Sequence, residues 1–437
     1  MSESVVSTTQ AAWRSTTLGA VTSWASGGTP SKANSDFWDG AIPWVSAKSL
    51  KSFYLYDSDD RVTEAAVADG ARLALPGDVL MLVRGMTLHH DVPVGVAMRP
   101  MTFNQDVKGI RGRNGADSRF IAYWLLAHKE SLLAAVDQAS HGTGRLQTDL
   151  LLSMQLRLPP QEEQRSIVAV VAALDDKIEQ NRQTVQVLER LARAVFRAWF
   201  VDFEPVKAKA AGATAFPSMP QPVFDALPMR FVDSDIGPVP EGWEVKALSS
   251  FCTLVSGGTP KRSEAAYWDG DVPWYSVKDA PGHGELWVIG TSERITADGL
   301  ADSAARVVPK GSTIISARGT VGKLAMAGVP MAFNQSCYGL LPGDGKSFGH
   351  LNLLMRSVVA ELQQRTHGSV FDTITRATFD GLLVTGPRDK VVSTFESVVD
   401  PLLALLLALV DESSKLAAMR DYLLPKLLSG EVRAASA

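Results

Sequence analysis

A long internal duplication dominates this sequence. The blocks Ser-Gly-Gly-Thr-Pro at 26–30 and Phe-Trp-Asp-Gly-Ala-Ile-Pro-Trp at 37–44 recur, with few changes, at 256–260 and 267–274. Three shorter pairs follow in the same order in both copies: Arg-Gly at 84 and 318, Phe-Asn-Gln at 103 and 333, and His-Gly at 141 and 367. A period of this length excludes a solenoid of short repeats and predicts two similar folded modules.

The composition is that of soluble domains with hydrophobic cores. A chain of 437 residues with 46% hydrophobic and 21% charged residues is long enough for two or three domains. Cys252 and Cys337 form at most one bridge and lack metal-ligand spacing. The longest apolar run, residues 401–410, is about half of a membrane-spanning helix, so we expect no membrane span and a cytoplasmic location. Because the net charge is −4, any nucleic-acid binding requires local basic patches.

A long helix is predicted after the first copy. Pro159 and Pro160 prevent helix upstream, and apolar residues then recur at alternating spacings of four and three, as in a coiled-coil seam. The predicted helix covers residues 161–203 and is roughly 55 Å long at about 1.5 Å per residue. The polar seam residue Asn181 either fixes the register of a helix pair or faces water at a bend. The seam consists of Ile167, Val171, Leu174, Ile178, Asn181, Val185, Leu188, Ala192, Val195 and Trp199.

A second, less regular apolar stripe predicts a partner helix at residues 389–430. Pro401 and Pro425 should kink or restart this helix, and Gly430 suits its C-terminal cap. Residues 204–240 contain seven prolines and are predicted to be a linker.

The order of these parts predicts a mixed α/β protein with two similar recognition domains, residues 1–160 and 241–388. An antiparallel pair of long coiled-coil helices would hold the two domains at opposite ends, related by an approximate two-fold axis. A rigid spacer between two related modules suits a long, repetitive ligand contacted at two separated points, such as duplex DNA.

Several further motifs give the chain a specific resemblance. They are Leu-Pro-Pro-Gln-Glu-Glu-Gln-Arg at 158–165, Leu-Asp-Asp-Lys-Ile at 174–178, Ala-Trp-Phe-Val-Asp-Phe-Glu-Pro at 198–205, Gly-Pro-Val-Pro-Glu-Gly-Trp at 237–243 and Leu-Leu-Pro-Lys-Leu-Leu-Ser-Gly at 423–430. Together with the duplicated blocks, and over nearly the whole chain, they resemble the specificity subunits of type I restriction-modification systems.

The resemblance implies a non-catalytic adaptor. Each domain would read one half of an asymmetric, bipartite sequence in double-stranded DNA, while the helices space the halves and dock two copies of an adenine methyltransferase subunit. A restriction and translocase subunit would complete the complex. The resemblance places S-adenosylmethionine, ATP and Mg in those partner subunits and no cofactor in this chain.

The residues themselves agree with a chain that has no catalytic site. An adenine methyltransferase holds the flipped base with an Asn/Asp-Pro-Pro-aromatic loop, and residues 158–161, Leu-Pro-Pro-Gln, lack both ends of that motif. The Gly-Lys-Ser at 345–347 lacks the glycine five positions earlier that a phosphate-binding loop requires, and is interpreted as a surface turn. The seven histidines show no pairing with Cys or carboxylates at metal-ligand spacing.

Residues shared between the copies are expected to form the scaffold and to position DNA. Trp38, Trp44, Trp268 and Trp274 are expected in the cores. Arg84 and Arg318 follow apolar strand-like runs and either contact DNA or form internal salt bridges. Phosphate contacts, which position without specifying, are expected at shared positions or next to them, although solvated side chains would look the same: Thr29, Lys32, Lys48, Thr259, Lys261 and Lys278.

Residues that diverge just after the shared anchors are the candidates for reading bases, because two domains that read different sequences must differ at their readers. Ordinary drift of loop sequences would produce the same divergence. In the first copy these candidates are Lys51, Tyr54, Thr87, His89, His90, Arg145 and Gln147, and in the second copy they are His283, Thr320, Lys323, Asp372 and Arg376.

The outer faces of the helices are expected to seat the methyltransferase, because the seam itself is needed for the pairing of the two helices. The candidates are Gln161, Glu162, Glu163, Gln164 and Arg165 at the start of the first helix, and Phe196, Phe200 and Phe203 at its far end.

Two alternatives stay open. A related modification system, in which nuclease and methyltransferase are fused in one partner, would use a similar recognition component. The duplicated Trp-rich domains could instead be carbohydrate- or peptide-binding modules, in which exposed aromatic rings stack on the ligand. Salt-sensitive binding to duplex DNA separates this second alternative from DNA recognition.

Overall fold

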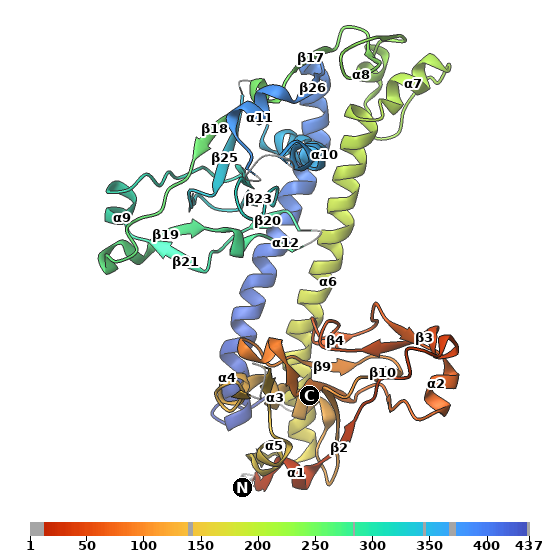
Figure 1. Cartoon of the computed structure of the whole chain (residues 1–437), viewed down its shortest axis with the longest axis vertical. Helices are drawn as coiled ribbons and strands as arrows, with labels where there is room; N and C mark the ends of the chain where they lie inside the picture. Colours follow the sequence, from red (N-terminus) through yellow and green to blue (C-terminus); the bar gives the residue numbers. More distant parts are fainter. Residues whose placement is uncertain (1–12, 139–142, 283–284, 344–346, 367–372, 435–437) are drawn as a thin grey trace, which may run out of the picture. The chain divides into compact units, whose positions relative to one another are not determined.

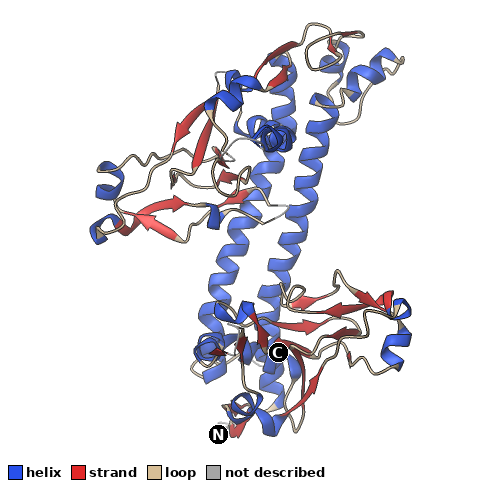
Figure 2. Ribbon diagram, viewed as in Figure 1, coloured by secondary structure: helices blue, strands red, loops and turns tan. Residues whose placement is uncertain are grey.

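The structure is a computed structural model that describes residues 13–138, 143–282, 285–343, 347–366 and 373–434. The chain divides into two compact units, of which the first comprises residues 1–177 and 416–437 and the second residues 178–415. Two long helices, α6 (Gln161–Phe200) and α12 (Asp389–Ser429), contribute to both units. In each unit the strands gather in a group beside these helices (Figures 1 and 2).

The first unit is built on two main sheets. One has five strands in the order β2 (Thr22–Ser26), β11 (Val107–Gly112), β7 (Val79–Leu82), β9 (Val94–Ala97) and β4 (Tyr54–Leu55). The other has four strands in the order β5 (Arg61–Val62), β3 (Trp38–Val45), β10 (Met101–Phe103) and β6 (Leu73–Ala74). Helices α3 (Ser118–Ala127), α4 (Lys129–Ala134) and α5 (Thr148–Ser153) follow the strands of these sheets in the sequence. Strand β14 (Gln155–Leu158) comes next and pairs with β1 (Arg14–Thr17) at the start of the chain.

The second unit repeats this topology. Its five-stranded sheet has the order β18 (Cys252–Ser256), β25 (Cys337–Pro342), β22 (Thr313–Ser316), β23 (Leu324–Ala327) and β20 (Trp287–Val288). A second sheet contains β21 (Glu293–Ile295), β19 (Trp268–Tyr275) and β24 (Ala332–Phe333), while β17 (Glu244–Ala247) pairs with β26 (Leu383–Gly386). In both five-stranded sheets the last strand is the one that runs parallel to its neighbour. The duplication predicted from the sequence is therefore present at the level of topology.

The apolar stripes of α6 and α12 lie in the cores of both units. In the first unit Ile167 and Val171 of α6 share a core with Leu424 and Leu427 of α12. The second unit's core contains, from α6 and α12, Val185, Ala192, Val195, Trp199, Phe395, Val399, Leu403 and Leu406. The helices run antiparallel, because Asn181 bonds Glu412 whereas Phe196, farther along α6, contacts Phe395, earlier on α12. The predicted coiled-coil fold class is confirmed.

The prolines of α12 do not interrupt it. The sequence predicted that Pro401 and Pro425 would kink or restart the helix; because α12 is continuous from Asp389 to Ser429, neither proline restarts it. Each proline removes one backbone hydrogen-bond donor from the helix. The buried side chains of Val399 and Leu403, on either side of Pro401, and of Leu424, next to Pro425, anchor the helix at these missing hydrogen bonds. Gly430 takes a positive φ of 78° and follows the last helical residue, as expected of a C-terminal cap.

Of the described residues, only those of α12 make a helix that is long and apolar enough to cross a membrane by length and composition. The same test is passed by core helices of soluble proteins. The apolar side chains of α12 that are buried in the two cores account for this composition.

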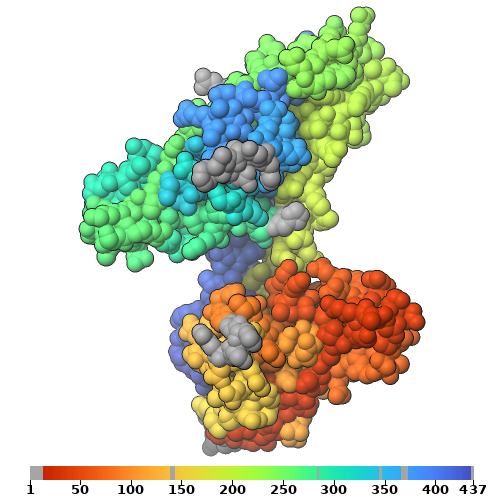
Figure 3. All heavy atoms as spheres, in the orientation of Figure 1, coloured from red at the N-terminus to blue at the C-terminus, as the bar shows by residue number. Residues whose placement is uncertain are grey.

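The predicted linker is partly folded. Residues 204–240 contain α7 (Glu204–Ala210) and α8 (Gln221–Asp225), each with a proline in its first turn, followed by the pairing of β15 (Phe231–Val232) with β16 (Val239–Pro240). Val206, Val223 and Phe224 are buried in the second unit's core. Figure 3, where the segment is yellow-green, shows it lying against the rest of that unit. Proline is common both in the first turn of a helix and in linkers. The proline content of residues 204–240 therefore could not distinguish short helices from a linker.

Candidate nucleic-acid interface

The shared Gly-Gly-Thr-Pro loop is held in the same way in both units. The hydroxyl of Thr29 donates to Oε1 of Gln105 at 2.7 Å, and Thr259 bonds Gln335 in the same way. A Cβ atom on Gly27 would lie 2.1 Å from the carbonyl oxygen of Phe103, so only glycine permits this close approach of the two backbones. In the second unit a Cβ atom on Gly257 would lie 2.2 Å from the carbonyl oxygen of Asn334 and 2.6 Å from that of Phe333. This loop therefore belongs to the common scaffold.

The shared tryptophans form an edge-to-face pair in each unit. Ring centroids of Trp38 and Trp44 are 5.3 Å apart, and those of Trp268 and Trp274 are 5.2 Å apart. Trp44 and Trp274 are buried, and each indole donates a hydrogen bond to a loop carbonyl. The other two rings are half-buried. The prediction of core aromatics is confirmed for the buried pair and holds in part for Trp38 and Trp268.

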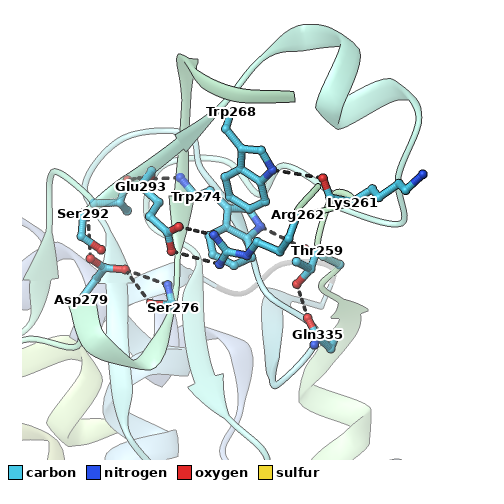
Figure 4. Close-up of polar contacts among 12 residues, drawn as sticks. Thr259, Lys261, Arg262, Trp268, Trp274, Ser276, Asp279, Ser292, Glu293 and Gln335 are labelled. Carbon is cyan, nitrogen blue, oxygen red and sulfur yellow. Dashed lines mark hydrogen bonds and ion pairs between the residues drawn. The ribbon is translucent and has the colours of Figure 1, made fainter. Parts of the chain in front are cut away.

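In the second unit an arginine stacks on this tryptophan pair (Figure 4). The guanidinium of Arg262 lies 4.0 Å from the ring centroid of Trp268 and 5.0 Å from that of Trp274. Both of its terminal nitrogens donate to the carboxylate of Glu293, and this hydrogen bonding lowers the pKa of Glu293. Arg262 occupies the position of Lys32 in the duplication. Lys32 and Lys261 were predicted as phosphate contacts and Arg262 was not, although alignment of the two copies places Arg262 opposite Lys32.

A capped turn presents the next candidate. Asp279 accepts hydrogen bonds from the backbone of Ser276 at 2.8 Å and of Ser292 at 2.7 Å (Figure 4). These bonds fix the short turn Val277–Asp279, on which Lys278 is exposed. The turn leaves the lysine side chain directed to solvent, as a phosphate contact requires.

Two candidate residues of the first unit lie directly opposite each other. Strand β8 (Arg84–Gly85) pairs with β13 (Gly144–Arg145), and Arg84 is the register partner of Arg145. Both side chains are exposed, and neither forms an ion pair with any carboxylate of the described residues. Like charges in directly opposed positions destabilise a sheet. On its other side Arg145 lies opposite Asp137 of β12 (Asp137–Gln138), whose carboxylate offsets part of this repulsion.

The same region of the second unit is a glycine-rich turn. Arg318 forms a bridge with Thr373, as Arg84 pairs with Arg145 in the first unit. Ser316 binds both ends of the turn, because its hydroxyl donates to the carbonyl of Thr320 and accepts from the backbone of Lys323. Gly319 and Gly322 take φ angles of 74° and 84°. Arg318, Thr320 and Lys323 are exposed on this turn.

The remaining DNA-binding candidates differ in how exposed their side chains are and in whether those side chains already form hydrogen bonds within the chain. Tyr54 is half-buried, and its hydroxyl lies 3.3 Å from that of Tyr123. Gln147 donates to Asp137 at 2.5 Å, and Arg376 donates to the backbone carbonyl of Leu254 at 3.2 Å. Thr87 and Thr259 are partly buried, whereas Thr29, Lys32, Lys48, Lys51, His89, His90 and Lys261 are exposed. His283 and Asp372 lie outside the described residues.

Five of the eight predicted partner-binding residues are buried or contact other parts of this chain. Gln164 is fully buried and bonds the backbone of Asp117 and Gly115, while Phe196 and Phe200 are buried in the second unit's core. Glu163 accepts hydrogen bonds from the indole of Trp13 and from Arg433, and Phe203 packs against Trp243 and Phe231. The apolar periodicity of the helix shows which residues face the other helix. It does not show that the rest of each unit packs against Gln164, Phe196 and Phe200. Gln161, Glu162 and Arg165 are exposed as predicted.

Two apolar side chains of α6 are exposed at positions that were not predicted as partner contacts. Val187 and Leu191 are one helical turn apart on α6 in the second unit and are 54% and 47% exposed. Exposed apolar residues are common on protein surfaces, and these two are candidates for contact with another protein because they share one helix face.

Metal and thiol chemistry find no support among the described residues. Within them, no group of three His, Cys, Asp or Glu side chains could hold a metal ion. Cys252 and Cys337 are free and buried, and burial raises the pKa of each thiol to about 12. Such thiols remain protonated and unreactive at neutral pH.

Comparison with known proteins identifies the family. The family described as "Type I restriction modification DNA specificity domain" matches residues 11–190 and 240–388. The HindI specificity subunit of Haemophilus influenzae is 29% identical over 324 residues, which cover 65% of this chain and 70% of that protein. The MjaIX specificity subunit of Methanocaldococcus jannaschii is 26% identical over 420 residues, which cover 94% and 91%.

A solved structure has a similar fold. The S subunit of a type I restriction-modification system from M. genitalium aligns with a TM-score of 0.60 and 14% sequence identity, over 97% of both chains. The family match covers both copies of the duplication, including the shared loops and the paired tryptophans described above. The chain therefore belongs to the type I restriction-modification DNA specificity family and is a non-catalytic specificity subunit.

Proposed function

We propose that each unit reads one half of an asymmetric, bipartite sequence in duplex DNA. The two units share a scaffold, down to the Thr29–Gln105 and Thr259–Gln335 hydrogen bonds, but differ in the side chains that they expose around it. A shared frame with different exposed side chains supports two readers of the same kind of ligand with different sequence preferences. Two different half-sites make the complete site asymmetric.

The observation that carries this proposal is the opposed pair Arg84 and Arg145. Two exposed guanidinium groups in register on adjacent strands repel each other in the free protein, and Asp137, opposite Arg145 on its other side, offsets only part of this repulsion. A phosphate or the edge of a guanine between them would relieve that repulsion, since arginine offers paired donors to both groups. In the second unit the Arg318 turn occupies the same place and supports the same role.

We assign the other candidates according to their surroundings. Exposed lysines on fixed turns, such as Lys48 and Lys278, fit phosphate contacts that position the duplex. Lys51, His89, His90, Thr320 and Lys323 lie in segments that differ between the copies and fit base reading.

The partners follow from the family. The chain acts with adenine methyltransferase subunits and a restriction subunit on DNA, and S-adenosylmethionine, ATP and Mg would be bound by those partners. We propose docking of the methyltransferase on the exposed side chains of α6, namely Gln161, Glu162 and Arg165 in the first unit and Val187 and Leu191 in the second. The proposed location of the complex is the cytoplasm.

Salt-dependent DNA binding tests this function. The purified complex with its methyltransferase should bind duplex DNA with an affinity that falls linearly with salt on a log–log plot, with a slope of about −0.9 per phosphate contact. Replacing both Arg84 and Arg318 with alanine should weaken binding and flatten the slope, whereas an Arg182→Ala variant on α6 should match the wild type. Affinity that does not depend on salt, or that survives the double replacement unchanged, would refute the proposal.

A further inference from the structure

A buried polar network joins four elements of the first unit. The carboxylate of Asp175, on α6, is 7% exposed. Its Oδ2 accepts a hydrogen bond from the hydroxyl of Tyr123, on α3, at 2.9 Å, and its Oδ1 accepts one from Arg420, on α12, at 2.8 Å. The hydroxyl of Tyr54, on β4, lies 3.3 Å from that of Tyr123. We call these four residues the Asp175 network.

The network satisfies a charge that would otherwise be costly to bury. A buried carboxylate is tolerated when it is paired and its oxygens are hydrogen-bonded, and here each oxygen of Asp175 has a partner. Burial raises the pKa of Tyr54 to about 12 and also raises the pKa of Tyr123. Both phenols therefore keep their protons at neutral pH, so the Tyr123 hydroxyl is a permanent donor to Asp175.

The network ends in a segment that is a candidate for base reading. Tyr54 lies three residues after Lys51, and both are among the side chains that differ between the two copies. Phe53 stacks on the ring of Tyr123 with centroids 4.8 Å apart and planes inclined by 30°. Tyr123 thus holds Phe53 through its ring and Tyr54 through its hydroxyl, and that hydroxyl is itself fixed by Asp175 of α6.

The second unit does not contain this network. Trp287 on β20 takes the place of Tyr54 on β4, and its indole nitrogen has no hydrogen-bond partner among the described residues. A different carboxylate of α6, Glu189, pairs there with Arg193 at 2.5 Å and lies 3.7 Å from Arg356 of α10 (Phe348–Thr366). The Asp175 network is therefore particular to the first domain and is not part of the shared scaffold.

We propose that Asp175 is a positioning residue that fixes the reading segment of the first domain on α6, and so limits which spacing between the two half-sites the complex accepts. The inference rests on the proposed reading of a bipartite site. Asp175 touches no DNA in this account. It acts through Tyr123, and loosening the network should relax the choice of spacing more than the choice of bases.

The test compares methylation of duplexes that differ only in the spacer between the half-sites. The assembled complex would be given the natural spacer and spacers one base pair shorter and longer. Tyr123→Phe removes only the hydroxyl, and the ratio of methylation rates on natural and altered spacers should fall about tenfold, the effect of losing one hydrogen bond to a charged group. Asp175→Asn should act in the same direction, and the double variant should be no worse than the stronger single variant.

Tyr56→Phe is the matched control, because Tyr56 lies in the same segment but is 52% exposed and outside the network. It should keep the wild-type ratio. If Tyr123→Phe does not assemble, Tyr54→Phe removes the outermost hydroxyl and should lower the ratio by a smaller factor. A variant that melts at a lower temperature but keeps the wild-type spacer ratio would overturn the inference. A wild-type complex that methylates no gapped site would instead refute the proposed function.

Discussion

The side-chain amide of Asn181 on α6 donates a hydrogen bond of 2.7 Å to Oε2 of Glu412 on α12. Asn181 is 1% exposed, so the interpretation of this residue as a water-facing side chain at a bend is wrong. A polar residue buried in an apolar seam favours the one register in which its partner lies opposite.

Asn181→Ala should therefore destabilise the helix pair. Glu412 and Ser413 each lose a donor, and the expected loss is about 1–3 kcal/mol, seen as a lower thermal unfolding midpoint. Gln183→Ala, at an exposed position on the same helix, is the control. Equal midpoints for the two variants would show that the Asn181–Glu412 bond contributes nothing.

Arg84→Ala and Arg145→Ala should each weaken DNA binding and lower the salt slope by about one unit, if each guanidinium neutralises one phosphate. Arg84→Ala should not lower the stability of the free chain, because it relieves the repulsion between the pair, whereas Arg145→Ala also removes the cation opposite Asp137. Fluorescence anisotropy at several salt concentrations and thermal unfolding together measure both effects. Loss of stability without loss of DNA binding would assign the pair a structural role.

Glu189→Ala should be severely destabilising for the second unit. Glu189 is 2% exposed beside Arg193 and Arg356, and burial lowers the pKa of Arg356 to about 10. Breaking a buried ion pair leaves an uncompensated charge and typically costs about 3–5 kcal/mol. Glu179→Ala is matched to it, since Glu179 pairs with Arg182 on the same helix at the surface, where a pair is worth about 1 kcal/mol or less. Similar unfolding midpoints for the two variants would contradict this difference.

Leu191→Arg should weaken binding of the methyltransferase subunit without lowering the unfolding midpoint of this chain. Leu191 is exposed, so an arginine there is solvated in the free protein but meets an apolar surface in the complex. Phe200→Ala should do the reverse and act first on stability, because Phe200 is buried in this chain's own core. Calorimetric titration with the methyltransferase subunit measures the affinity, and thermal unfolding of the free chain measures the stability. Unchanged affinity in Leu191→Arg would show that Val187 and Leu191 are not part of the docking surface.

Acid should weaken the Arg262–Glu293 pair. Because the hydrogen bond from Arg262 lowers the pKa of Glu293 in the folded chain below its ordinary value of 4.5, the stabilisation is complete above that value. It is lost as the pH falls through the lowered pKa. The difference in unfolding midpoint between wild type and Glu293→Gln should shrink under acidic conditions. A difference that is the same at neutral and acidic pH would show that the charge of Glu293 does not contribute.

The duplication and the long first helix could be predicted because each leaves a repeated pattern in the sequence. Ile167, Val171 and Val185 follow a seam that any helix pair must bury. The same pattern could not reveal Asp175 or Glu189, because charged residues on a helix normally face solvent. Their partners Tyr123, Arg420 and Arg356 lie far away in the sequence.

The candidate interface was predictable only in part. The comparison of the two copies identified Arg84 and Arg145 separately, but their opposition depends on the pairing of β8 with β13, two segments about 60 residues apart in the sequence. Arg262 could have been predicted only by noticing that it occupies the same position in the second copy as Lys32 does in the first. Phe196 and Phe200 looked like surplus apolar residues because the elements that cover them come from the second half of the chain.

The central claim is that this chain alone decides which adenines its complex modifies. The most direct test is a genome-wide map of N6-methyladenine in cells that express the methyltransferase with this chain, compared with cells that express the methyltransferase alone. The account predicts a new gapped motif, asymmetric and modified once on each strand, that is present only with this chain and is lost in the Arg84→Ala, Arg318→Ala double variant. A well-assembled complex that produces no such motif would contradict the claim.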